Sequence, residues 1–585
     1  MTQTQFNQKN KIRNGIVILL SIISLIICIA VLFPQIRQMI VHLVEHIEYK
    51  KAGTYQSWFN TFLSYAMGGI CFILPFDYCI LTDSGKALVQ KVKQEIKDCL
   101  SEVDFRSFLK PVLLLSGVYL LGILTIIRAN FLYIDDIART EGGTRGWYHW
   151  SRYISDFSSI FVHADTRLTD ISPVPQLLAI LILSISSVLL VYVIANKKIT
   201  PVRLLASIPL GLSPYFLACL SFKFDAPYMA LSILASIVPF LFIARKKAFL
   251  FCSVVSLLVM CMTYQAASGI YLMVAVIHCF QDWNSRKKSS KEILFFLGIV
   301  ALSFCFVIVV FKFFLMISVD WYASTAIFPL PHIISGTLNN IKNYFLLINH
   351  DWGIIWKMGI ALVMLFFIIR SVYQSEQKRL LSFFGSILVI GLSFVLSFGV
   401  YSLLENPLYA PRAMFGFGVF LSILCVYVVS GYKKLATVVV LALNWCLFVF
   451  AFSYGNALAD QERYAEFRIG LLLHDLSSLY PNRNSGDMTF QLKNTIDYTP
   501  TIKNIAMHYP VIESLVPKKL GKEVHGVFWG STVYYLEYFG YGSYNNDVSY
   551  DSDCDYDSLN LPVVLDSYYH TIKSDGSHVL IILKH

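Results

Sequence analysis

The sequence contains little charge. Only 14% of its 585 residues are Asp, Glu, Lys or Arg, whereas 56% are hydrophobic. A soluble domain carries about 25% charged residues. The apolar residues are gathered in runs that are long enough to cross a bilayer. This composition excludes an ordinary soluble domain, and it predicts an all-α polytopic membrane protein.

Signatures of nucleotide, cofactor and metal binding are also missing. The chain has no P-loop, no dinucleotide fingerprint and no serine or cysteine nucleophile motif. Its 12 cysteines lie mostly in or beside apolar runs, without metal-ligand spacing. The run Asp551–Asp557 resembles the start of a calcium loop, but Pro562 replaces the required glutamate. We therefore expect no cofactor and assign no metal ligand, and a metal requirement is left open.

About thirteen apolar runs are predicted to cross the membrane, and most have the roughly 17–25 residues that a span needs. Basic residues precede the first run, which lacks a cleavage site and is therefore interpreted as a retained span. The predicted spans lie near 15–33, 59–81, 109–127, 175–195, 204–221, 226–244, 248–264, 266–281, 293–317, 353–370, 380–403, 413–431 and 435–453.

The distribution of Lys and Arg predicts the orientation. Short basic clusters such as Arg245–Lys247 and Arg286–Lys291 are typical of cytoplasmic loops. The net charge of +10 is attributed to this bias, so no nucleic-acid partner is expected. The N-terminus is predicted to be cytoplasmic. The division is 1–108, N-terminal spans and a cytoplasmic loop; 109–454, a transmembrane core with outer loop 129–174; and 455–585, a C-terminal α+β domain on the non-cytoplasmic side.

One predicted unit is interrupted. Residues 248–281 are too long for one upright span and short for two, and basic clusters flank both ends. A hairpin with a polar tip at Tyr264–Gly269 is the better interpretation. Gln265 lies in that tip, where it forms either a hydrogen bond between helices or a contact to substrate. Interrupted segments often indicate a binding site.

The outer loop carries the first candidate groups for chemistry. Asp135 and Asp136 follow a span end, where an acidic side chain is costly unless it is solvated, paired or functional. One interpretation is a solvated loop start or an ion pair with Arg139. The other is a general base that removes a proton from an acceptor hydroxyl. Trp147 offers a flat apolar face for a sugar, and Arg152 offers a fixed cationic fork.

Two further polar turns are predicted on the same side. Lys223 and Asp225 form either a mutual ion pair or a site for a lipid phosphate and a sugar. Arg412 follows Pro407 and Pro411 and directly precedes a predicted span. Its side chain either extends its charge to the membrane interface or binds phosphate in a bidentate manner.

Several of these segments resemble one known family. Tyr133–Arg139, Gly146–Trp147, Arg152, Asp170–Ala179, Ser221–Ser232, Tyr264–Ala266 and Asn406–Arg412 occur in the order found in the serotype-converting O-antigen glucosyltransferases, the Gtr type-specific integral membrane family. The resemblance covers about residues 110–470. Ala138 and Thr140–Thr144 depart from the expected small-residue stretch, which leaves the acceptor preference open.

The resemblance implies a GT-C-like enzyme in the bacterial inner membrane. Such enzymes move a sugar, here glucose, from a polyprenyl phosphate to an O-antigen or related lipid-linked or surface glycan on the non-cytoplasmic side, and family members work beside a separate flippase and donor synthase. It further implies that Asp135 or Asp136 is the base of an inverting displacement. Arg139, Arg152, Lys223 and Arg412 become the candidates for the phosphate. A polysaccharide polymerase, another sugar donor and a lipid-linked glycan transporter are the alternatives.

Overall fold

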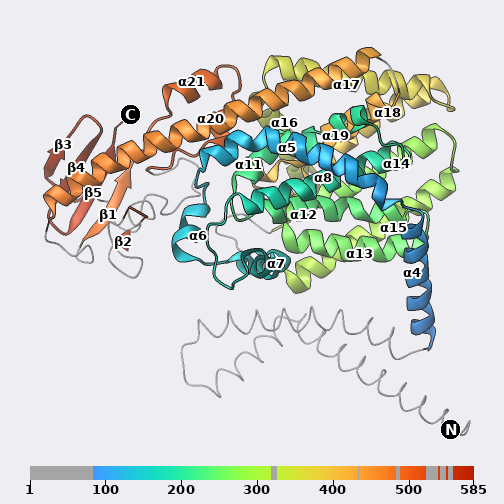
Figure 1. Ribbon diagram of the computed structural model, residues 1–585, viewed down its shortest axis with the longest axis horizontal. Coiled ribbons are helices and arrows are strands. Elements are labelled where there is room, and N and C mark those ends of the chain that lie inside the picture. The colour runs from blue at the N-terminus through green and yellow to red at the C-terminus, as the bar shows by residue number, and fades with distance from the viewer. Residues whose placement is uncertain are drawn as a thin grey trace, which may run out of the picture.

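The computed structural model describes residues 83–317, 326–431, 434–481, 488–521, 538–539, 549–550, 556 and 558–584. In these ranges the chain forms a bundle of helices, and a small sheet lies beyond one end of the bundle (Figure 1). The first two predicted spans and the aspartate run 551–557, apart from residue 556, lie outside the described residues.

The helices follow one another with short connections. The α-helices are α4 Asp83–Ser101, α5 Leu109–Ala129, α6 Asp136–Gly142, α7 Tyr153–His163, α8 Val174–Ile194, α9 Pro201–Ala206, α10 Pro209–Leu212, α11 Pro214–Ser221, α12 Ala226–Ile237, α13 Lys246–Thr263, α14 Ser268–Asn284, α15 Ser290–Val310, α16 Ile333–Asp351, α17 Ile354–Tyr373, α18 Arg379–Leu396, α19 Gly416–Val429, α20 Lys434–Leu479, α21 Pro500–Ala506 and α22 Ile512–Leu515. Short 3-10 or π turns are η1 Phe105–Phe108, η2 Trp147–Trp150, η3 Val238–Phe242, η4 Gln265–Ala267, η5 Phe311–Leu315, η6 Gly399–Leu403 and η7 Pro411–Ala413.

The multi-pass character predicted from composition is confirmed, but the count of about thirteen spans is not. In the described ranges, 7 helices are long and apolar enough to cross a membrane, or 8 if the bent pair Pro201–Leu212 and Pro214–Ser221 is one span. The segments Ala226–Phe242 and Gly416–Val429 are apolar but shorter. The predicted interruption after residue 263 is present, because α13 ends there and η4 separates it from α14.

The short apolar helices form the centre of the bundle. Every residue of α19 is buried, as are nearly all residues of α12. A helix that is apolar on all sides must be surrounded by protein or lipid, and here longer helices such as α8 and α14 pack against both. Buried serines on these helices bond to carbonyls one turn earlier or across to a neighbour, as Ser422 does to the carbonyl of Ser207.

Helix α20 connects the bundle to the sheet. Its 46 residues make it about 69 Å long, more than twice the thickness of a hydrocarbon core. Its first part packs along α5, and its last part extends past the bundle to the sheet (Figure 1). Gly455 permits this close packing, since a Cβ there would meet the backbone of Thr125 and Ile126. The proposed division at residue 455 therefore falls inside one continuous helix.

The sheet has five strands in the order β2-β1-β5-β4-β3. β1 pairs in parallel with β2 and β5, while β3, β4 and β5 are antiparallel neighbours. Its apolar face packs on Leu472 and Leu476 of α20. The strands are β1 Thr489–Lys493, β2 Ser549–Tyr550, β3 Val563–Asp566, β4 His570–Ser574 and β5 His578–Leu583.

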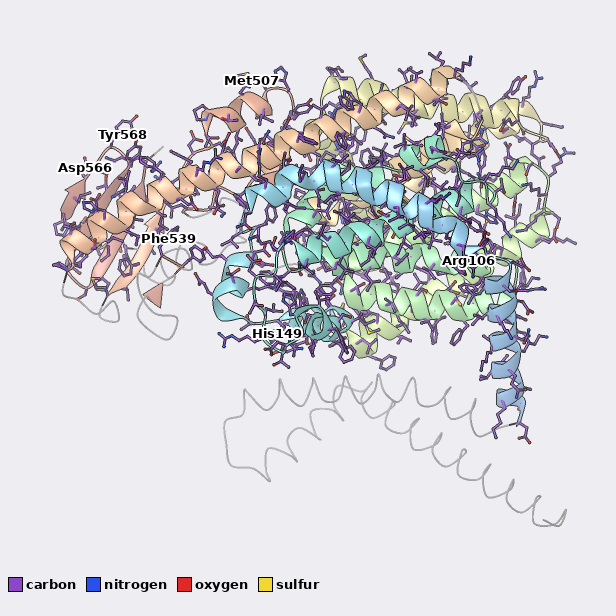
Figure 2. All side chains as sticks on the ribbon, in the orientation of Figure 1. Arg106, His149, Met507, Phe539, Asp566 and Tyr568 are labelled. Carbon is purple, nitrogen blue, oxygen red and sulfur yellow. The ribbon has the colours of Figure 1, made fainter. Side chains whose placement is uncertain are left out.

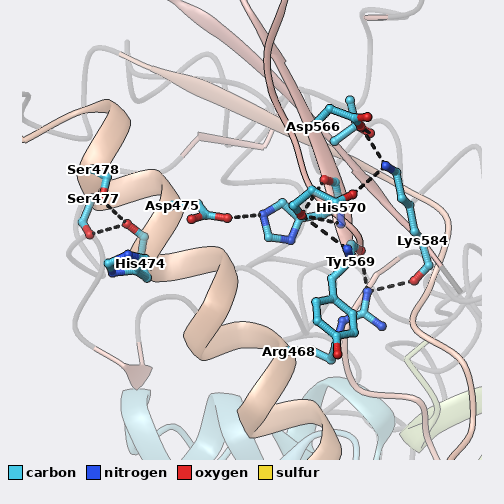
Figure 3. Close-up of polar contacts among 11 residues, drawn as sticks. Arg468, His474, Asp475, Ser477, Ser478, Asp566, Tyr569, His570 and Lys584 are labelled. Carbon is cyan, nitrogen blue, oxygen red and sulfur yellow. Dashed lines mark hydrogen bonds and ion pairs between the residues drawn. The ribbon is translucent and has the colours of Figure 1, made fainter.

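Polar contacts fix the sheet to α20 (Figure 3). The buried Arg468 donates to the carbonyls of Tyr569 and Lys584, at 2.6 and 2.8 Å. Asp475 lies 3.0 Å from the ring of His570. Because these bonds join one helix to the ends of two strands, the sheet and α20 form a single unit.

The two ends of the bundle carry different elements. The amphipathic helix α4 projects at one end, and α6, α7 and the sheet lie toward the other (Figure 1). The side chain of Arg106 lies beside α4, whereas Asp566 and Tyr568 lie on the sheet at the opposite end (Figure 2). Helix α4 and the sheet, which the sequence predicts on opposite sides of a membrane, therefore lie at opposite ends of the molecule (Figure 1).

Candidate functional site

The outer loop predicted at 129–174 is largely ordered into short helices. Asn130 ends α5 in a left-handed conformation, a geometry that asparagine tolerates well. The chain then turns into α6, whose first residue is Asp136 and whose N-cap is Asp135. Leu132 and Ile137 pack into the apolar core between α20 and the sheet. The loop is therefore held between the bundle and the C-terminal unit.

Asp136 is fully buried and connects two segments. One of its oxygens, Oδ2, accepts from the backbone N–H of Tyr133 at 3.1 Å and from that of Lys223 at 3.0 Å. The other oxygen, Oδ1, has no hydrogen-bond partner. Burial raises the pKa of Asp136 to about 7, against the lowering effect of the two N–H groups and of Arg139. This carboxyl group holds the start of α6 to the turn after α11.

Asp225 is the centre of a second set of contacts. It accepts a hydrogen bond from the indole N–H of Trp147 at 2.5 Å and forms an ion pair with Arg139. Arg152 lies 4.0 Å from the same carboxylate and stacks on the ring of Tyr264, with 4.5 Å between the guanidinium carbon and the ring centroid. Arg139 stacks likewise on Trp147 at 4.5 Å. The two guanidinium groups are thus held in place by one carboxylate and two aromatic rings.

Lys223 does not pair with Asp225, which corrects the mutual ion pair considered from the sequence. Its ammonium group instead lies 2.8 Å from Asp170 and 2.7 Å from the amide oxygen of Asn130. We refer to Asp136, Arg139, Trp147, Arg152, Asp170, Lys223 and Asp225 as the inner network. Its three cations face three carboxylates, so the charges balance when all are ionised.

Asp135 lies outside the inner network, although it is adjacent to Asp136 in the sequence. Its side chain is exposed. The preceding residue, Ile134, has a φ of 51°. A β-branched residue rarely adopts this conformation, which costs on the order of 1–3 kcal/mol and is concentrated at functional sites. The turn therefore places two adjacent aspartates in opposite environments.

The remaining predicted residues lie at the edges of the network. Gln265 in η4 donates to the carbonyl of Trp150 at 3.3 Å. Arg412, in η7, lies over the ring of Phe222 with 5.5 Å between the guanidinium carbon and the ring centroid. The rings of Phe222 and Tyr133 contact each other edge to face.

A cavity of about 720 Å³ is lined by these two rings and by Arg412. This volume is in the range of small-molecule sites. Arg412 is the one predicted site residue that lines it. The lining comes from the 133–134 turn, the end of α11, the end of α16, residues 408–412 and the C-terminal segment 495–518: Tyr133, Ile134, Ala218, Phe222, Leu347, His350, Asp351, Leu408, Tyr409, Ala410, Pro411, Arg412, Thr495, Tyr498, Pro510, Glu513, Ser514, Val516, Pro517 and Lys518.

Asp351 lines this cavity and was not singled out from the sequence. It ends α16 with 6% of its surface exposed, and its carboxylate accepts from the hydroxyl of Tyr215 at 2.8 Å. Burial raises its pKa. A usable signal was present, since Asp351 lies just before the predicted span 353–370, as Asp135 lies a few residues after the predicted span 109–127. The stretch had been interpreted as a connecting loop, and α16 occupies most of it.

Comparison with known proteins identifies the family. A family model described as "Glucosyl transferase GtrII" matches residues 124–429, slightly more than half of the chain. The chain belongs to the GtrII glucosyltransferase family. It is therefore a membrane glycosyltransferase, and the resemblance drawn from the sequence is confirmed at the level of the family. The match includes the inner network, Asp135, Asp351 and Arg412, but it ends before the C-terminal segment that closes the cavity.

A relative from Salmonella phage P22 supports this membership. It is described as an uncharacterized 55.3 kDa protein in the gtrB 5' region, and it is 23% identical over 438 residues. The alignment covers 72% of this chain and 88% of the relative. No solved structure matches the chain. The family thus gives the class of reaction, while the geometry of the site has to be argued from this chain.

Proposed function

We propose that this GtrII member transfers a glucosyl group from a polyprenyl phosphate to an O-antigen or similar surface glycan, and so changes the serotype. The observation that carries this proposal is the cavity at the Ile134 turn, because it joins carboxylates, cations and aromatic faces, and the exposed Asp135 directly follows that turn. The family supplies the reaction class, and the cavity supplies a place for a sugar.

We assign the general base to Asp135. A base must come within hydrogen-bond reach of the hydroxyl whose proton it removes. Asp135 is exposed and follows the cavity-lining, left-handed Ile134, whereas Asp136 has no exposed surface and its Oδ2 already accepts two bonds. The strained turn is a reason to place the chemistry here, since strain of this kind is retained where the surrounding structure requires it.

The proposed step is one displacement. Asp135 takes the proton of the acceptor hydroxyl while that oxygen bonds to the anomeric carbon of the sugar. The bond from the anomeric carbon to the phosphate oxygen breaks, and its electron pair leaves with the polyprenyl phosphate. A single displacement inverts the anomeric configuration. No nucleotide takes part, which agrees with the missing phosphate loops.

Arg412 is the proposed partner of the donor phosphate. Among the cations chosen from the sequence, Arg412 is the one that lines the cavity, and a guanidinium binds phosphate oxygens in a bidentate manner. The inner network then acts as the support of the site: it fixes the turns that carry Asp135 and Phe222.

The proposed topology places this end of the bundle outside the cytoplasm, in the bacterial inner membrane. The basic cluster Arg245–Lys247 supports a cytoplasmic location for the α4 side, since the next residue, Ala248, donates its N–H to Glu95 of α4. The donor lipid and the glycan would meet the enzyme in the outer leaflet, after a flippase and a donor synthase have acted. A reporter that works only in the periplasm is expected to be active when it is fused to the C-terminus. A reporter that works only in the cytoplasm is expected to be inactive at the same position.

The direct test uses the purified full chain in lipid nanodiscs. Synthetic polyprenyl-phosphate glucose and surface polysaccharide from the producing bacterium are supplied, and the glycan is analysed by mass spectrometry and NMR. We expect a gain of one hexose with inverted anomeric configuration, and no gain with Asp135→Asn. A gain with retained configuration would contradict the single displacement. Movement of lipid-linked glycan across the bilayer without any hexose gain would favour the transporter alternative.

A further inference from the structure

The cavity has two walls of different origin. Tyr133, Asp351 and Arg412 come from the part of the chain that matches the family, residues 124–429. The opposite wall comes from residues 495–518, which lie beyond that match. We call this segment the C-terminal wall. In such a cavity, the wall from the family core can carry the reaction that the family shares. The wall from the other segment can select the substrate of this particular chain.

Specific contacts hold the C-terminal wall in place. The hydroxyl of Tyr133 donates to the carbonyl of Leu515 at 2.8 Å, which ties the wall to the turn before Asp135. Val511 donates its N–H to the carbonyl of Asp351 at 3.3 Å. The side-chain amide of Gln461 on α20 donates to the carbonyls of Asp497 and Lys518, at 3.3 and 3.4 Å. The wall is therefore a fixed surface that is joined to both sides of the site.

Two further residues, Lys519 just after the wall and Tyr509 within it, also anchor the segment. The buried Lys519 forms an ion pair with Glu462 of α20, and its ammonium group lies 4.0 Å from the ring centroid of Phe131. Tyr509 packs against Trp356 and Phe450. Neither anchor lines the cavity, so the groups that hold the wall differ from the groups that it presents inward.

The groups presented inward suit a saccharide. Tyr498 donates its hydroxyl to the carbonyl of Glu513 at 2.6 Å, and the ammonium group of Lys518 lies 4.8 Å from its ring centroid. Sugars bind to such sites through stacking on aromatic rings and through hydrogen bonds between their hydroxyls and charged side chains. On the facing side, Asp351 is held by Tyr215, with Oδ1 only 3.4 Å from the ring of exposed His350. A neutral or zwitterionic sugar ring can contact both the cation Lys518 and the carboxylate Asp351, whereas an anionic ring would be repelled by Asp351.

We infer that the C-terminal wall and Asp351 form the binding site for the acceptor saccharide, so that residues beyond the family match select the glycan that is modified. This inference rests on the proposed function for the identity of the reaction. It adds which end of the cavity takes the acceptor: Arg412 faces the donor phosphate, and Lys518, Tyr498 and Asp351 contact the acceptor ring.

The test separates the acceptor from the donor. Lys518→Gln and Asp351→Asn are assayed in the full chain in nanodiscs, with Lys503→Gln as the matched control. Lys503 is an exposed lysine of the same segment that pairs with Asp497 and does not line the cavity. We expect the KM for the polysaccharide to rise about ten-fold in the two cavity variants, as for loss of a bond to a charged group. The KM for the lipid donor should match wild type.

Binding is measured in parallel, independently of catalysis. Lipid-free polysaccharide from the producing bacterium is titrated against the same proteins and followed by saturation-transfer NMR, after thermal unfolding has shown that each variant is folded. Loss of binding in the cavity variants alone supports the inference, even if wild type consumes no lipid donor, which would refute only the proposed function. Unchanged acceptor binding in both folded variants, or a raised KM for the donor alone, would overturn it.

Discussion

The inner network and the cavity meet at the turns of Tyr133 and Phe222, and they use charge in different ways. In the network, Asp225 is 3% exposed and contacts Arg139, Arg152 and Trp147. In the cavity, Arg412 belongs to a surface that a substrate can reach, and the exposed Asp135 directly follows the cavity-lining Ile134. The charged residues of the inner network thus stabilise the structure, and the residues proposed for catalysis and phosphate binding lie next to them.

This difference shows how adjacent residues obtain separate roles. Asp135 and Asp136 have the same functional group, but burial and two N–H donors fix Asp136, while the strained turn at Ile134 directs Asp135 outward. A buried ion network also explains why so many charges occur beside a membrane span: each is acceptable there only with a partner. The predictions below test whether the two sides differ as described.

The largest effect is expected from Asp135→Asn. Removal of a general base typically lowers the rate by 10²–10⁴-fold, and we expect a loss of about 10³-fold in kcat. The side chain is exposed and acts on the buried Arg139 only through its charge, so the change in thermal stability should be small. The measurement is hexose transfer to polysaccharide at saturating donor. Asp136→Asn should keep much more activity, and the reverse order would exchange the roles of the two residues.

A large loss of stability is expected from Asp225→Asn. The substitution leaves Arg139 and Arg152 without their shared carboxylate in a buried site, and such a change costs about 3–5 kcal/mol. Thermal unfolding in detergent is the measurement. Asp460→Asn on α20 is the control, because its pair with Arg463 is exposed and is worth at most about 1 kcal/mol. Equal shifts in both variants would show that the network adds no more than a surface pair.

A smaller, pH-dependent effect is expected at Asp136. Its pKa is about 7 in the folded chain, whereas the ordinary pKa of an aspartate in an unfolded chain is about 3.8, so the folded state holds a proton that the unfolded state releases. The resulting stability is complete below about pH 4 and is lost as the pH rises toward 7, by up to about 1.4 kcal/mol per unit. Wild type should therefore lose about 2 kcal/mol between pH 5 and 7 relative to Asp136→Asn. Parallel unfolding profiles for the two proteins would contradict this titration.

The sequence predicted the parts of this structure that depend on local composition. Apolar runs located the long helices, and the polar interruption after residue 263 marked the break at η4. Charged residues next to predicted spans also identified members of the inner network, since a charge near a membrane needs a partner close in space. The partner of each charged residue was not predictable from the sequence. Lys223 pairs with Asp170, 53 residues away, and not with the nearby Asp225.

The cavity was beyond the reach of sequence patterns for a physical reason. Its walls come from segments as far apart as Tyr133 and Lys518, which meet only because α20 carries the C-terminal unit back to the outer loop. Tyr498, Glu513 and Lys518 have no periodicity or motif that marks them. Exposure was equally hidden: adjacent aspartates look alike until the backbone at Ile134 is known.

The smallest effect is expected from Arg412→Gln, and it tests whether Arg412 differs from the cations of the inner network. Arg412→Gln should raise the KM for the polyprenyl-phosphate donor about ten-fold, or about 1.4 kcal/mol, because one charged contact to phosphate is lost. The KM for the polysaccharide and the unfolding temperature should stay close to wild type. Arg463→Gln is the control, since this arginine is exposed on α20 and pairs only weakly with Asp460. If Arg412→Gln instead lowers stability as much as Asp225→Asn does, Arg412 is a structural cation like those of the inner network, and the donor phosphate must be bound by another group.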